Sequence, residues 1–416
     1  MTKDREDLIQ WLRSEKPETV VAGIAQKLEQ GVSTDELWAV GALTAARYVS
    51  NQARNLLGFV SHAMIGCEDA RAAADQQPED IQRLMLIQAL SQVVMDLQDP
   101  CFAPYELSDV WGIEESSVEE SIAQLRSDVR FGEWLRADHR LVGLERKIPR
   151  AELVDLILDI GLEGIVTDDH TLITPALSLD MMELTGWEDG FAMLRGTIRY
   201  SCTFPRNFGP YDLASSLVDE FNLSEKLIQG TEDQTKAQQL RVAILEAKAA
   251  DRPRLVASSL ADGVSAETMM SALSLAACDM YLQVEPVPHD DYDAVSREVA
   301  PIHIGTTLNI LRASLSRMFR ATAARAVVMG GCLLERGPSI LNEDFEFIPF
   351  VPGPAYPRAE QVEAARSKGT NELLEELEKS LYSHDVGLAT AAVKAFELAG
   401  GDPEELITLL VRVACT

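Results

Sequence analysis

The sequence predicts an all-α protein built from repeated helix–turn–helix units. Apolar residues recur at spacings of three and four, as in "ELWAVGALTAARYV" (36–49) and "ETMMSALSLAACDMYL" (267–282), and few stretches alternate with the period of two that half-buried strands need. Helix-start signals recur along the chain. The exception is "FEFIPFVPGPAYP" (345–357), which is rich in proline and aromatic residues and is expected to be extended.

Four of the expected helix starts share one pattern, seen in "GVSTDEL" (31–37), "KIPRAEL" (147–153), "GVSAETM" (263–269) and "GDPEEL" (401–406). Each has a helix breaker followed by a carboxylate in the first turn, where it faces the positive end of the helix dipole. Leu37 and Leu153 are 116 residues apart, as are Leu153 and Met269, while Met269 and Leu406 are 137 apart. The repeat predicts αα-hairpins stacked in an α-α superhelix or bundle.

We therefore expect a single all-helical repeat domain over residues 1–416 with one Pro-rich extended insert. Its sub-units are expected at about 1–118, 119–235, 236–355 and 356–416, following the repeat interval.

Composition excludes several classes of protein. Hydrophobic residues make up 46% and charged residues 25% of the chain, as in globular proteins, and no apolar run is long enough to span a membrane. The 66 acidic and 37 basic residues give a net charge of −29 without a Lys/Arg cluster, so nucleic acid is not an expected partner. The charged N-terminus and the scattered cysteines predict a cytoplasmic protein with reduced thiols.

Four of the six histidines fall at expected helix starts, and these four are His62, His170, His303 and His384. Equivalent positions in a repeat can converge on the interior, and gathered neutral imidazoles form a metal site, for which we expect iron, with zinc or copper as alternatives. Nearby carboxylates, Glu68 and Asp169, are the candidates that complete the ligand shell or move protons.

A plainer interpretation stays open for the same residues, because a histidine at a helix start can cap an amide or pack. The sequence contains no Glu-x-x-His or His-Glu-x-x-His pair that would supply two ligands from one helix. His139 and His289 are expected in solvated loops without a role.

A histidine that opens successive helices, as in "HIGTTLNIL" (303–311), resembles a group of uncharacterised bacterial all-helical proteins, some with a Rieske-type partner domain. More distantly, it is similar to the questin oxidase-like proteins. Over roughly residues 31–400, the resemblance implies a metal-dependent or redox-linked enzyme that acts on a small molecule and works with a redox partner protein. Its ligand positions would be the four histidines at helix starts. The chain has no Cys-x-His pair for a Rieske cluster of its own.

Two functions from different classes follow. The first is a metal-dependent oxidoreductase acting on a small organic molecule at a histidine-built site between helices. The second is a non-catalytic helical-repeat scaffold for protein–protein interaction, in which the histidines only pack or cap. Homo-oligomerisation is left open.

Overall fold

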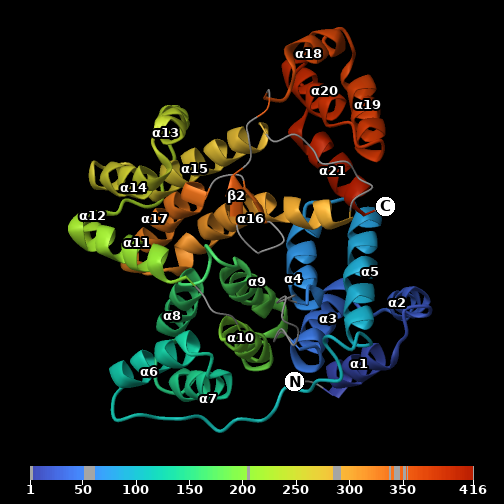
Figure 1. The fold of residues 1–416 in the computed structure, drawn as a ribbon. Helices are drawn as coiled ribbons and strands as arrows, with labels where there is room; N and C mark the ends of the chain where they lie inside the picture. The colour runs from blue at the N-terminus through green and yellow to red at the C-terminus, as the bar shows by residue number, and fades with distance from the viewer. Residues whose placement is uncertain are drawn as a thin grey trace. The chain divides into compact units, whose positions relative to one another are not determined.

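The computed structural model is all-α, as predicted (Figure 1). It describes residues 3–50, 61–203, 207–283, 292–336, 339–341, 347–349, 353 and 355–415. Within these ranges the only strands are β1 (Ser339–Leu341) and β2 (Phe347–Pro349), an antiparallel pair in which Ile340 faces Ile348. The second strand lies in the segment 345–357 that was expected to be extended.

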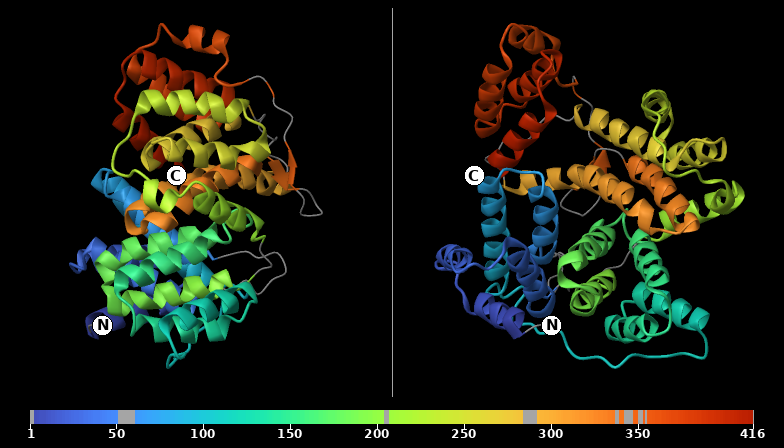
Figure 2. Two further views of the ribbon diagram at one scale, coloured as in Figure 1. Left: turned by 90° about the vertical axis from the view of Figure 1, so that its left-hand side faces the viewer. Right: turned by 180° about the vertical axis from the view of Figure 1, so that it is seen from behind.

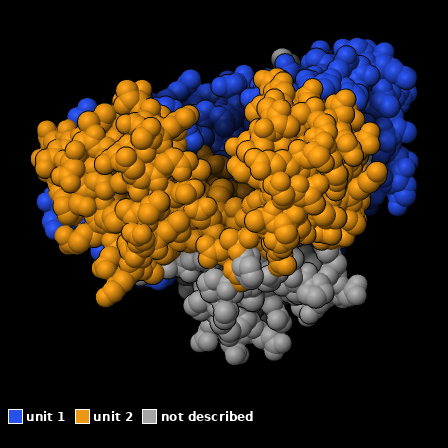
Figure 3. Space-filling model, turned by 90° about the horizontal axis from the view of Figure 1, so that it is seen from above, with its two compact units in different colours: residues 1–220, 310–329 blue, residues 221–309, 330–416 orange. Residues whose placement is uncertain are grey.

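The chain divides into two compact units, coloured separately in Figure 3. Unit 1 comprises residues 1–220 and 310–329, and unit 2 comprises residues 221–309 and 330–416. Two of the three boundaries fall inside helices, α16 (Tyr292–Ser314) and α17 (Arg320–Arg336), so residues 292–309 of α16 belong to unit 2. The expected division into four sub-units stays a prediction.

In its described residues, unit 1 contains eleven complete α-helices and the segment that returns at residue 310. The helices are α1 (Lys3–Ser14), α2 (Val20–Glu29), α3 (Thr34–Tyr48), α4 (Ala63–Ala74), α5 (Glu79–Asp96), α6 (Val118–Arg130), α7 (Trp134–Glu145), α8 (Arg150–Leu162), α9 (His170–Thr185), α10 (Trp187–Ser201) and α11 (Gly209–Glu220). The returning segment holds the end of α16, the short η2 (Leu315–Arg317) and most of α17.

Unit 2 contains the remaining helices and the hairpin. The helices are α12 (Leu223–Lys226), α13 (Gln234–Glu246), η1 (Ala249–Asp251), α14 (Arg252–Ala261), α15 (Ala266–Tyr281), α18 (Ala359–Ala365), α19 (Thr370–Tyr382), α20 (Val386–Leu398) and α21 (Pro403–Ala414). Helices α18 to α21 lie together as one group in all views (Figure 2), and α19 and α20 pack on each other around Leu373 and Phe396.

The repeated helix starts are present at the predicted places. Ser33 and Ser265 accept hydrogen bonds from the first-turn amides of α3 and α15, and Asp402 does the same for α21. Gly31 and Gly263, which end the helices before two of these turns, have positive φ values that suit glycine. The helix that follows each of these turns packs mainly against helices other than the one before the turn. Helix α3 contacts α1 and α4, and helix α15 contacts α13. The sequence pattern at these turns therefore predicts where a helix begins, but it does not predict which helices pack against each other.

One hydrophobic cluster of unit 1 joins residues of four helices, α4, α9, α10 and α16. Ile65 of α4, Ile173 and Leu177 of α9, and Tyr200 of α10 form its buried part, and Ile310 of α16 packs against it. These residues come from segments far apart in the sequence, and all of them belong to unit 1. The cluster therefore fixes the N-terminal ends of α4 and α9 and the last turns of α16 relative to one another.

Helices α8 and α9 approach closely at Gly161. A Cβ atom at this position would lie 2.7 Å from the carbonyl oxygen of Thr171 and 3.1 Å from the Cα of Leu172, both backbone atoms of α9 that cannot rotate away. The missing side chain thus allows the first turn of α9 to rest on α8.

We expect Gly161→Ala to lower the free energy of unfolding by about 1–3 kcal/mol, because α9 must move outward to make room. Gly66→Ala in α4 is the matched control, since a Cβ there meets no described atom within 4 Å and alanine favours the helix. Urea unfolding followed by circular dichroism measures both. Equal stability of the two variants would show that the α8–α9 contact tolerates a methyl group.

Candidate metal centre

His62 and His170 lie at the starts of α4 and α9, the two helices whose first turns contribute residues to the hydrophobic cluster. His170 is the first residue of α9, three and seven residues before Ile173 and Leu177, so all three share one face of the helix. His62 is the N-cap residue of α4, three residues before Ile65. The two imidazole rings meet edge to face with centroids 5.3 Å apart. The hydrophobic cluster thus carries both histidines at its edge.

His303 differs from the expectation that it opens a helix. Helix α16 begins at Tyr292 and ends at Ser314, so His303 lies at its middle. The helix runs through Pro301, two residues before His303, because the preceding residues include helix formers such as Ala294 and Glu298. Since Ile310 lies seven residues after His303, both are on one face of α16. His303 belongs to unit 2, whereas Ile310, on the same face of the helix, belongs to unit 1.

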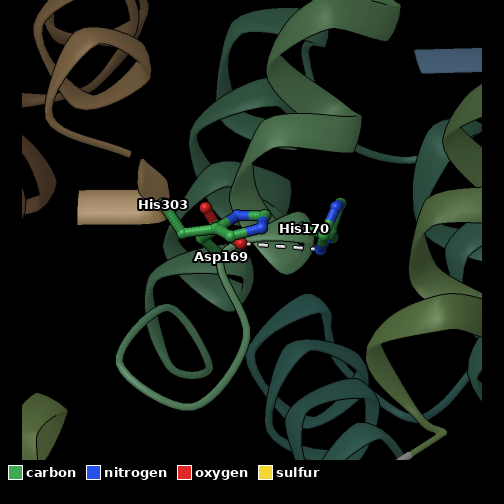
Figure 4. A group of neighbouring side chains, drawn as sticks. All are labelled: Asp169, His170 and His303. Atoms are coloured by element: carbon green, nitrogen blue, oxygen red, sulfur yellow. Dashed lines mark ion pairs between the residues drawn. The ribbon is translucent and has the colours of Figure 1, made fainter. Parts of the chain in front are cut away.

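One ligand atom from each of Asp169, His170 and His303 lies within 4.8 Å of the other two (Figure 4). Asp169 is buried and both histidines are half-buried. Asp169 Oδ1 is 3.5 Å from His170 Nδ1, the ion pair that is dashed in Figure 4. Asp169, the N-cap residue of α9, accepts backbone hydrogen bonds from Leu172 and Ile173 through its own carbonyl. The carboxylate is thereby held at the start of the helix.

A second carboxylate, that of Asp168, contacts the same nitrogen of His170. Asp168 Oδ1 is 2.9 Å from His170 Nδ1 and also accepts the backbone N–H of His170 at 3.2 Å. Its other oxygen accepts the hydroxyl hydrogen of Tyr200. Carboxylate–imidazole pairs of this kind are the usual support of a metal-ligating histidine.

The residue before His62 is anchored by a buried carboxylate as well. The Ser61 hydroxyl donates to Asp96 Oδ2 at 2.6 Å and accepts the N–H of Ala63 at 3.2 Å. Gln92 donates to the other oxygen of Asp96 at 2.6 Å. Burial raises the pKa of Asp96, while the hydrogen bonds from Ser61 and Gln92 counteract the rise. This network fixes the start of α4 and with it the backbone of His62, whose side chain is exposed.

The two other sequence-predicted site residues lie outside this group. Glu68 is buried in α4, where neither carboxyl oxygen has a hydrogen-bond partner among the described residues, and burial raises its pKa well above the usual value. His384 is exposed in the turn between α19 and α20 of unit 2, with a left-handed backbone at φ 56°. The cap of α20 there is Asp385.

Two residues near the candidate site, Tyr200 and Asp96, could not be identified from the sequence. Tyr200 and Asp96 look like ordinary helix residues, and only the fold brings them to Asp168 and Ser61. His139 is not in a solvated loop: it lies buried in α7, with its ring 5.0 Å from that of Trp111. His289 lies outside the described residues.

The donor set of Asp169, His170 and His303 suits a transition metal. Two imidazoles and one carboxylate are the ligand types found at many non-haem iron sites. His62, beside His170, offers a further nitrogen.

No protein-family model, curated protein or solved structure matches the chain. Among the described helices, none combines the length and apolar character required to cross a bilayer. Function is therefore inferred from the residues of the site.

Proposed function

We propose that this protein is a metal-dependent enzyme, an oxidoreductase that acts on a small organic molecule, with iron as its metal and zinc or copper as alternatives. The observation that carries the proposal is the two-histidine, one-carboxylate group of Asp169, His170 and His303. This donor set leaves coordination positions open, which a purely structural metal site does not.

The protein's own residues have separate roles in the proposal. Asp169 and the two histidines hold the metal, with His62 as a further ligand or as a hydrogen-bonding group beside it. Asp168 accepts the hydrogen of His170 Nδ1 and so orients the ring. A bound iron would supply oxygen activation or polarise the substrate. Both histidines are half-buried.

Metal analysis of the purified protein tests the proposal. We expect one equivalent of metal in the unaltered protein and its loss in His170→Ala and in His303→Ala, because each removes one of three ligands. His384→Asn is the matched control: it removes an imidazole from an exposed turn outside the group, and asparagine tolerates the left-handed backbone. This variant is expected to retain its metal.

Circular dichroism of each variant separates loss of a ligand from loss of the fold. A folded protein without metal, even after incubation with iron, zinc or copper, would contradict the proposal and favour the scaffold function instead. Metal that is bound equally by all variants would place the site elsewhere. For bound iron, electron paramagnetic resonance before and after exposure to air distinguishes a redox-active metal from an inert one.

A further inference from the structure

A hydrogen-bonded chain runs from the core of unit 1 to His170. It begins at Tyr200, a residue of α10 that is only 1% exposed and whose ring belongs to the hydrophobic cluster with Ile65 and Ile173. The Tyr200 hydroxyl donates to Asp168 Oδ2, and Asp168 Oδ1 is 2.9 Å from His170 Nδ1. The rings of Tyr200 and His170 are 6.3 Å apart, centroid to centroid.

The direction of these hydrogen bonds follows from the chemistry of the groups. An ionised carboxylate has only acceptor oxygens, so both neighbours of Asp168 must bring the hydrogen. Tyr200 brings its hydroxyl hydrogen and His170 brings the hydrogen on Nδ1. A neutral imidazole with its hydrogen on Nδ1 has its lone pair on Nε2. Asp168 thus favours one of the two tautomers of His170.

The anchoring of Asp168 explains why Tyr200 matters. Asp168 stands in the short segment between α8 and α9, where its backbone carbonyl accepts the hydroxyl hydrogen of Thr171. Its side chain is still partly exposed, so without a partner on Oδ2 it can rotate toward solvent. The Tyr200 ring cannot follow such a motion, because it is packed on all sides in the cluster. Its hydroxyl is therefore a fixed point that holds the carboxylate against His170.

We infer that Asp168 and Tyr200 are positioning residues, which together set the tautomer and the ring orientation of His170. The consequence for metal binding rests on the proposed function, whereas the tautomer itself is a property of the metal-free protein. Neither residue belongs to the proposed metal ligands.

Nuclear magnetic resonance of metal-free protein carrying isotope-labelled histidine tests the inference, since the ring-nitrogen shifts report the tautomer. The His170 signal is assigned by its absence in His170→Gln. We expect a dominant Nδ1–H tautomer in the unaltered protein and a mixture in Tyr200→Phe, which removes one hydroxyl and keeps the ring. Tyr105→Phe is the control, because it removes another inward-facing hydroxyl of unit 1, one that accepts from Arg199 at 2.9 Å.

The second readout is metal affinity. We expect Tyr200→Phe to weaken binding by about 10–100-fold, the usual effect of losing the partner of a ligating histidine, and Tyr105→Phe to leave it unchanged. An unaltered His170 tautomer in Tyr200→Phe would overturn the inference. If the unaltered protein binds no metal but its tautomer depends on Tyr200, the proposed function fails and the positioning role stands.

Discussion

Asp159→Asn is expected to lower the free energy of unfolding by about 3–5 kcal/mol, the usual cost of breaking a buried ion pair from one side. Asp159 is a buried residue of α8, and its carboxylate forms ion pairs with two arginines. Arg325 of α17 contacts its two oxygens at 2.9 and 2.8 Å, and Arg126 of α6 contacts one at 2.5 Å. The asparagine side chain has nearly the same shape but no charge, so the guanidinium of Arg325 loses its anionic partner.

Tyr211 adds a third contact, with its hydroxyl 3.1 Å from both oxygens of Asp159. Burial, and then the charge of Asp159, raise the pKa of Tyr211 to about 12, so the hydroxyl keeps its hydrogen and donates it. Arg126 retains a second partner in Glu163 at 2.6 Å. Most of the expected loss therefore falls on Arg325, which ties the returning segment 310–329 to α8.

Asp180→Asn is the matched control for this prediction. Asp180 also pairs with an arginine of the returning segment, Arg317, but its side chain is 36% exposed. Water screens that pair, and its loss should cost no more than about 1 kcal/mol. Chemical denaturation at neutral pH compares the two variants. If Asp159→Asn costs no more than Asp180→Asn, the buried network contributes nothing beyond a surface pair.

The contrast between the helix starts and the Asp159 network shows which features a sequence reveals. Ser33 and Ser265 cap helices through bonds that span three residues, and a local pattern is enough to find them. The contact from Arg325 to Asp159 spans 166 residues. Nothing in the spacing of apolar or charged residues indicates which of many arginines meets which carboxylate. The fold class, which depends on local periodicity, was predictable from the sequence, and the packing of the helices was not.

The candidate site divides in the same way. His170 stood out because it is one of four histidines, out of six, that fall at expected helix starts, a signal that is local. His303 stood out for a partly wrong reason, since α16 begins well before it. Tyr200 carried no signal, because a tyrosine in an apolar helix is usually a core residue, and this one is both core and hydrogen-bond donor. Recognising it required the distance to Asp168.

Glu68→Gln is expected to stabilise the protein increasingly as the pH rises above the ordinary pKa of a glutamate, about 4.3. Glu68 is 1% exposed, and neither carboxyl oxygen has a hydrogen-bond partner among the described residues. Burial raises the pKa of Glu68 well above the usual value, and the Ser178 hydroxyl nearby lowers it only in part. In the unfolded chain the same carboxyl ionises near its ordinary pKa of about 4.3.

The sign follows from proton binding. Between the unfolded and the folded pKa the folded protein holds one proton more than the unfolded chain, so the free energy of unfolding falls as the pH rises. The slope approaches about 1.4 kcal/mol per pH unit until the folded pKa is reached. Glutamine resembles the protonated acid in shape and cannot ionise, so the variant lacks this slope. Below about pH 4 the two proteins should differ little.

Urea denaturation at several pH values measures this difference, with Glu79→Gln in α5 as the control because that carboxylate is 79% exposed and is already in water. Parallel pH profiles for Glu68→Gln and the unaltered protein would mean that the carboxylate of Glu68 is ionised and compensated in the folded state, by a bound cation or by water. A growing gap would mean that α4 carries a neutral acid, whose proton is retained at the pH where surface carboxylates have lost theirs. Only in the second case does Glu68 hold a proton that it can give up inside the protein.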